Sequence, residues 1–156
     1  TQDYPTEWSN VEKTGQECPD VSGSYEDTGI KTSSDYQPSL TQFLGLNKYE
    51  ADTVNLTIKN NLIEAVAIKD KKIVETKEFS YPTESAYCKE GNWVIENNDS
   101  HNREGVLGKE WKTYFLSNNS DGLVINQKQS AVGMIFFVPI AGSESTWVLF
   151  KRKPKK

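Results

Sequence analysis

The stretch Thr53-Val-Asn-Leu-Thr-Ile-Lys59, followed by Asn60-Asn61 and by Leu62 to Ile68, decides the fold class. Apolar residues occupy every second position from Val54 to Ile58, and this period of two places them on one face of a β-strand. Two asparagines in a row tolerate the positive φ that a tight hairpin requires. The stretch therefore predicts two antiparallel strands joined by a two-residue turn.

Further strands follow along the chain, each separated from the next by turn-forming residues about ten positions apart. We predict that ordered structure begins at Val21-Ser-Gly-Ser-Tyr25 and that a polar loop covers residues 96–105. The unbroken apolar run from Val132 to Val138 should be the most buried strand, because it carries apolar side chains on both faces rather than on one. The other predicted strands are 73–79, 92–96, 111–116, 123–129 and 146–150.

One short helical turn is predicted between the first ordered residues and the hairpin. Leu40, Phe43 and Leu44 fall at positions i, i+3 and i+4, which form one face of a helix. A proline precedes them and Gly45 follows, as is typical of helix starts and ends. We expect this turn over residues 39–46.

Many short strands without a long amphipathic helix predict an all-β domain. We favour a small, lipocalin-like antiparallel β-barrel of roughly eight strands, because closure would remove exposed strand edges. A two-sheet β-sandwich is the alternative. The expected organisation is a flexible N-terminal tether over residues 1–17, the β-barrel domain over residues 18–152 and a basic tail over residues 153–156.

Length and charge limit the function classes. The chain has 156 residues, which suits one domain, and no apolar run is long enough to span a membrane. Residues 1–29 hold seven acidic side chains against Lys13 alone, whereas residues 151–156 hold five basic ones. That basic end could touch phospholipid headgroups, although solvated termini are the more common case. A sequence pI of about 5.1 argues against nucleic-acid binding.

The two cysteines, Cys18 and Cys88, predict a disulfide. In the chain-entropy model a cross-link between them stabilises the fold by about 4 kcal/mol. The alternative is a pair of unrelated thiols, since sequence alone does not show that they meet. A zinc site is not expected, because only His101 could join them and a closed site takes four ligands.

Signals for catalysis and for metal binding are weak, so we expect no enzymatic activity, no cofactor and no metal. His101 is the one histidine, and no Gly-x-Ser-x-Gly nucleophile elbow accompanies it. The 97–104 segment has oxygen ligands for calcium but lacks the spacing of an EF-hand loop. Four acidic side chains are interpreted as surface residues that favour solubility rather than as catalytic groups: Glu84, Glu96, Asp99 and Glu104. Trp8, Trp93, Trp111 and Trp147 could line a ligand cavity or a partner surface, although alternating aromatics are more often core.

Three separated motifs carry a resemblance to a known group of proteins. They are Cys18-Pro-Asp-Val-Ser-Gly-Ser-Tyr25, Pro38-Ser-Leu-Thr-Gln-Phe-Leu-Gly45, and Phe136-Phe-Val-Pro-Ile-Ala-Gly-Ser143 with Trp147. In this order they resemble small uncharacterised proteobacterial lipoproteins over most of residues 18–152. The resemblance implies an exported envelope protein made with a signal peptide, and a lipid-bearing cysteine upstream of Thr1. It implies no activity.

We therefore expect a non-enzymatic, membrane-anchored lipoprotein domain of the bacterial periplasm or outer surface, monomeric, that binds a protein or envelope component. One alternative is a periplasmic inhibitor of a lysozyme-type hydrolase, suggested by a faint similarity of the Tyr87-Cys-Lys-Glu-Gly91 turn to such inhibitors. The other is a lipocalin-like carrier of a small apolar ligand, which requires an internal cavity.

Overall fold

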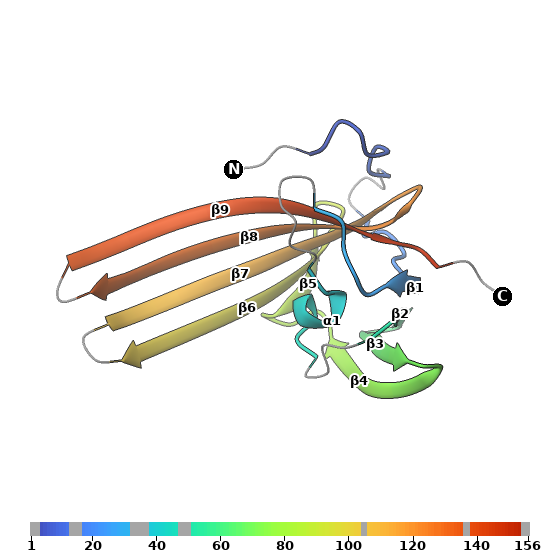
Figure 1. The fold of residues 1–156 in the computed structure, drawn as a ribbon, viewed down its shortest axis with the longest axis horizontal. Helices are drawn as coiled ribbons and strands as arrows, with labels where there is room; N and C mark the ends of the chain where they lie inside the picture. Colours follow the sequence, from blue (N-terminus) through green and yellow to red (C-terminus); the bar gives the residue numbers. More distant parts are fainter. Residues whose placement is uncertain are drawn as a thin grey trace.

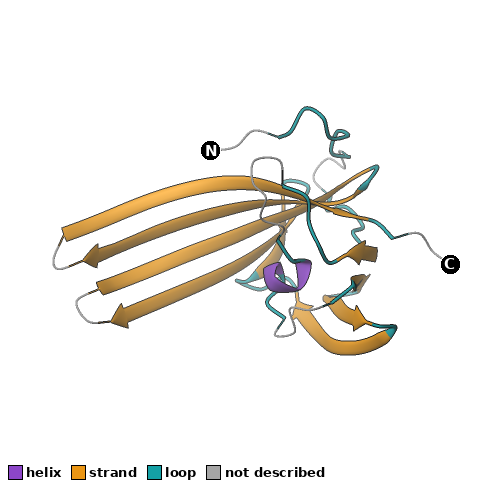
Figure 2. Cartoon of the chain, viewed as in Figure 1, coloured by secondary structure: helices purple, strands orange, loops and turns teal. Residues whose placement is uncertain are grey.

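The computed structural model shows a strand-rich chain with one short helix (Figures 1 and 2). The structure describes residues 4–12, 17–31, 38–46, 51–103, 106–135 and 138–153, with the backbone alone over 97–103, 106–111, 131–135 and 138–144. The elements are β1 (Gly23–Glu26), α1 (Leu40–Phe43), β2 (Thr53–Lys59), β3 (Leu62–Lys69), β4 (Lys72–Ser80), β5 (Ala86–Lys89), β6 (Asn92–Arg103), β7 (Val106–Asn119), β8 (Gly122–Ile135) and β9 (Val138–Lys151).

The strands form two antiparallel sheets. A four-stranded sheet has the order β1-β2-β3-β4, and a five-stranded sheet has the order β5-β6-β7-β8-β9. Isolated bridges link the sheets at one side, pairing Tyr25 with Arg152 and Ile30 with Leu149. On the other side the described residues of β4 and β5 do not pair, and the sheets meet there through side chains, with the rings of Tyr81 and Trp93 4.8 Å apart.

The all-β prediction is confirmed, and the described residues agree with the two-sheet alternative rather than with a closed barrel. The physical reason is the short β5, whose four residues pair with β6 and leave the edge of β4 without a backbone partner among the described strands. The described part of the chain contains no helix that is long and apolar enough to cross a membrane.

The core lies where the inner faces of the two sheets meet. Strands β2, β3, β6, β7, β8 and β9 each contribute alternate residues to it, so the period of two read from the sequence becomes the packing pattern. Helix α1 covers one end, where Phe43 stacks on Tyr114 at 5.1 Å and meets Phe150 edge-on at 5.7 Å. The largest fully buried side chains are Tyr25, Phe150, Leu40, Leu46, Leu116, Leu123 and Ile125.

Two local predictions are confirmed and two are wrong. Asn60 has a φ of 49° in the turn between β2 and β3, and α1 occupies the predicted helical position. The polar loop predicted for 96–105 is instead largely β6, because its backbone pairs with β7 along its whole length. The run from Val132 to Val138 is not one strand, since Ile135 of β8 pairs with Val138 of β9 across a hairpin. The predicted burial of this run concerns side chains outside the described set.

The four long strands β6 to β9 extend to one side, beyond α1 and the smaller sheet (Figure 1). Backbone hydrogen bonds hold this extension, since the register of β6, β7, β8 and β9 continues without a shift to the hairpin ends. Polar side-chain composition had favoured a loop there. Pairing with a neighbouring strand outweighed that local preference, because β-propensity depends strongly on context.

Helix α1 has only four residues and depends on Asp27 for its start. The Asp27 side chain is 4% exposed, and its Oδ1 accepts the Thr41 backbone N–H at 2.8 Å. Its Oδ2 accepts the Ser39 hydroxyl at 2.8 Å, while its backbone carbonyl accepts the Leu40 N–H. A helix this short is not stable alone, so these bonds and the packing of Leu40 fix it.

We predict that Asp27→Ala lowers the free energy of unfolding by about 1 to 3 kcal/mol, because buried donors lose their acceptor. Asp27→Asn keeps an acceptor oxygen and should cost less. The exposed neighbour Glu26 provides the control as Glu26→Ala. Urea unfolding of the three variants measures the difference, and equal midpoints for Asp27→Ala and Glu26→Ala would contradict the role of Asp27.

The structure joins Cys18 to Cys88, with Cα atoms 5.9 Å apart and a sequence separation of 70. This bond ties the segment before β1 to β5, and so connects the two sheets. Beside it the Trp93 indole donates a hydrogen bond to the Pro19 carbonyl at 2.7 Å. A disulfide is typical of proteins in an oxidising environment, which indicates export.

Reduction of this disulfide should lower the melting temperature by several degrees, since the cross-link removes about 4 kcal/mol of chain entropy from the unfolded state. The Cys18→Ser/Cys88→Ser variant should melt at the same lower temperature. Scanning calorimetry with and without reductant tests this, and a reductant effect on the double variant would point to another cause.

Residues 4–12, which belong to the predicted flexible tether of residues 1–17, contact the domain. The Glu12 N–H donates to the Asn118 carbonyl at 2.7 Å, and the fully buried Asn119 amide donates to Tyr4 Oη and to the Ser9 carbonyl. Tyr4 looks isolated in the sequence because two of its partners, Asn119 and Trp147, lie more than 100 residues away. Residues 1–3 and 13–16 lie outside the described residues.

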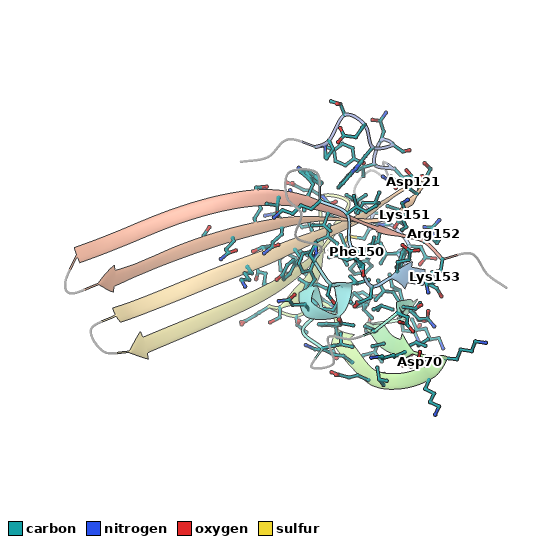
Figure 3. All side chains as sticks on the ribbon, in the orientation of Figure 1. Asp70, Asp121, Phe150, Lys151, Arg152 and Lys153 are labelled. Atoms are coloured by element: carbon teal, nitrogen blue, oxygen red, sulfur yellow. A yellow bond between two sulfur atoms is a disulfide. The ribbon has the colours of Figure 1, made fainter. Side chains whose placement is uncertain are left out.

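The basic end stays on the fold as far as the structure describes it. The Arg152 N–H donates to the Asp121 carbonyl at 3.0 Å, and the Lys153 N–H donates to the Ser24 carbonyl at 2.8 Å. Figure 3 shows Arg152 and Lys153 leaving the end of β9 beside β1. Residues 154–156 of the predicted basic tail lie outside the described residues.

Candidate binding groove

The face of the larger sheet that points away from the core carries a row of three side chains. Tyr114, Ile125 and Val148 face the core, so the adjacent residues of β7, β8 and β9 point to the other side. The register sets Phe115 opposite Asn126 and Asn126 opposite Trp147. An aromatic ring, an amide and a second aromatic ring therefore cross three neighbouring strands.

The N-terminal segment forms a wall beside this row. The Tyr4 ring lies edge-to-face with Trp147 at 5.0 Å, and the Trp8 ring lies edge-to-face with Tyr4 at 5.9 Å. Polar contacts hold the segment in place, including a bond from the Ser9 hydroxyl to the Asp121 carboxylate at 3.1 Å.

The turn between β5 and β6 forms the opposite wall. Glu90 and Gly91 have φ values of 51° and 82°, as expected for a two-residue hairpin loop in which both central residues are left-handed. This turn sets Glu90 and Asn92 at the rim.

Together these parts enclose a surface cavity of about 670 Å³, which we call the outer groove. Its volume is within the range of small-molecule sites. It lies on the outer face of the sheet, whereas the carrier hypothesis required a cavity inside the fold. Its lining residues are Tyr4, Asn10, Val11, Glu90, Asn92, Phe115, Ser117, Asn126, Lys128 and Trp147.

The polar groups of the outer groove are mainly amides. Asn126 Oδ1 accepts the Ser145 hydroxyl at 3.0 Å, which leaves the Asn126 NH₂ group as a donor. The side chains of Asn10 and Asn92 make no hydrogen bond within the part of the chain that the structure describes. Lys128 Nζ lies 5.0 Å from the centroid of the Phe115 ring, a cation–π distance. The described lining of the groove thus holds one cation, one carboxylate and several uncharged groups.

The residues singled out from the sequence do not meet in one site. His101 pairs with Gly108 through the backbone of β6 and β7, and its side chain lies outside the described set, as do the side chains of Asp99 and Trp111. Glu104 lies outside the described residues. Among the residues that are described, no three acids, histidines or cysteines cluster as metal ligands.

The remaining predicted residues occupy separate places. Glu84 is exposed in the loop before β5, and Glu96 accepts the Tyr87 hydroxyl at 3.0 Å. Desolvation and this bond raise the pKa of Tyr87. Trp93 is a core residue, whereas Trp147 lines the outer groove.

A second cavity, of about 630 Å³, lies between β1, β2 and the end of β9. The Arg152 guanidinium there lies 5.9 Å from the centroid of the Tyr25 ring, and burial raises the pKa of Tyr25. Hydrogen bonds from Ser22 lower the pKa of Asp20. Small polar side chains and both signs of charge line this cavity, and it lacks the aromatic row of the outer groove.

Comparisons with protein-family models, with curated proteins and with solved structures found no match. The role of the outer groove therefore rests on its own geometry.

Sequence reasoning identified Trp147 as a possible ligand-contacting residue and missed Phe115 and Asn126. The available signal was strand alternation, because the residues between core positions of a strand occupy its other face. The wall formed by Tyr4 had no such signal, since nothing local links residue 4 to β9.

We predict that Trp147→Ala loosens the N-terminal segment, because the ring contact with Tyr4 is lost. Hydrogen exchange at the Glu12 amide, which bonds to Asn118, should accelerate by roughly 2- to 10-fold, as expected for loss of one aromatic pair. Ile73→Ala is a suitable control, since Ile73 is 68% exposed on β4. Unchanged exchange in Trp147→Ala would show that the polar bonds alone hold the segment.

Proposed function

We propose that this chain is a non-enzymatic binding domain of an exported bacterial envelope protein, and that the outer groove binds an envelope component. The observation that carries the proposal is the row of Phe115, Asn126 and Trp147 in an open cavity. Ligand sites commonly combine apolar rings with a few polar groups that fix orientation.

The lining of the outer groove supports binding rather than catalysis. Among the described lining residues the one carboxylate, Glu90, is exposed on a turn, and none of them offers an imidazole or thiol to pair with Ser117. General acid–base chemistry needs a positioned proton donor and acceptor. Amides such as Asn92 and Asn126 are neutral and serve recognition.

Export is supported by the disulfide between Cys18 and Cys88. The bacterial envelope and a lipid upstream of Thr1 are part of the proposal on the strength of the resemblance to small lipoproteins. A monomer is also part of the proposal.

Co-sedimentation of the purified chain with isolated bacterial envelopes tests the proposal. The wild type should pellet, and Phe115→Leu/Trp147→Leu should bind at least tenfold more weakly, because both rings are lost while apolar volume is largely kept. Ile73→Ala should bind like the wild type.

Equal pelleting of all three proteins would contradict the assignment of the outer groove, and no pelleting of the wild type would contradict envelope binding. Inhibition of lysozyme at stoichiometric protein, undiminished in the double variant, would favour the inhibitor alternative instead.

A further inference from the structure

We infer that the outer groove takes a saccharide chain. This inference rests on the proposed function and names the chemical class of its ligand. It follows from three properties of the groove: two aromatic rings at fixed spacing, uncharged groups that donate and accept hydrogen bonds, and a floor in which β7 and β8 pair on both sides.

The rings of Phe115 and Trp147 stand two strands apart in one row of the register. Neighbouring strands lie about 4.8 Å apart, so the two Cα positions are separated by about 10 Å. The face of an aromatic ring is negative and attracts polarised C–H groups. Sugar rings present such C–H groups on their flat faces, and two rings of a chain could pack on Phe115 and Trp147 once the exposed Lys128 side chain moves off the Phe115 ring.

The amides of the groove match hydroxyl groups. A hydroxyl both donates and accepts, and so does the side-chain amide of asparagine. Asn126 lies between the two aromatic rings with its NH₂ group available, while Asn10 and Asn92 reach the groove from opposite walls. A ligand rich in hydroxyl groups would thus meet amides along its length.

The charges argue against phosphate-bearing ligands. Recognition of phosphate uses clustered arginine or lysine side chains. The described lining residues include one cation, Lys128, with its Nζ near the Phe115 ring, and one acid, Glu90, of opposite charge.

The paired backbone argues against an extended peptide. A peptide that adds to a sheet needs a free strand edge. Strands β7 and β8 pair on both sides, and β9 pairs with β8 and, at Leu149, exchanges two hydrogen bonds with Ile30. Recognition on this floor therefore uses side chains, as the packing of sugar rings on aromatic rings does.

Isothermal titration of the full chain with two probes tests the inference. Tetra-N-acetylchitotetraose represents amino-sugar chains, and cellotetraose represents neutral glucans. We expect saturable binding of at least one of them. The preferred probe shows whether the ligand is an amino-sugar chain or a neutral glucan. Phe115→Leu and Trp147→Leu should each weaken binding by roughly 2- to 10-fold, the loss expected for one aromatic contact.

Asn126→Ala should weaken binding to a similar extent, through one lost hydrogen bond. Asn61→Ala removes an exposed amide from the turn between β2 and β3 and is its matched control. Ile73→Ala is the control for the ring variants, and both controls should bind within twofold of wild type. A melting scan of each variant establishes that it is folded.

Binding that persists unchanged in Phe115→Leu, Trp147→Leu and Asn126→Ala would overturn the inference. So would the absence of binding to both probes while envelope binding still depends on Phe115 and Trp147, and that result would leave the proposed function standing. Loss of envelope binding altogether is the separate outcome that removes the proposed function.

Discussion

Alternation of side chains between the two faces of β7, β8 and β9 is the constraint on which the rest of the structure depends. Leu116, Ile125 and Phe150 belong to the core between the two sheets. A strand cannot turn one side chain inward without turning the next one outward. The row of Phe115, Asn126 and Trp147 is therefore fixed by the same register that packs the core. A slip of one residue would exchange the two faces, so it would turn the groove residues toward the core and the core residues toward solvent.

The sequence predicted the parts of the fold that depend on local pattern. Alternation located β2 and β3, and Asn60 marked their turn. It failed where distant pairing decided the structure, as for β6, whose polar second half is a strand because β7 lies beside it. Closure of the sheets depends on which edges meet, and no local pattern encodes that. The short β5 was missed because four residues next to turns carry little periodic signal.

The candidate site, like the fold, was predictable from the sequence only in part. Trp147 was accessible to sequence reasoning as an aromatic residue in a strand, and Phe115 and Asn126 follow once the register is known. The wall that contains Tyr4 needed the structure, since the buried amide of Asn119 captures a segment more than 100 residues away in sequence. Side chains from β7, β8, β9 and two separate walls converge there. A site assembled in this way leaves no motif in the linear sequence.

The docking of residues 4–12 makes the outer groove a composite of two distant parts of the chain. Tyr4 contacts Trp147, and Asn10 and Val11 line the groove, so one wall is present only while this segment is bound to the domain. Occupancy of the groove and docking of the segment would therefore be coupled: a ligand that contacts both parts stabilises the docked segment, and the docked segment raises the affinity for that ligand by the same factor.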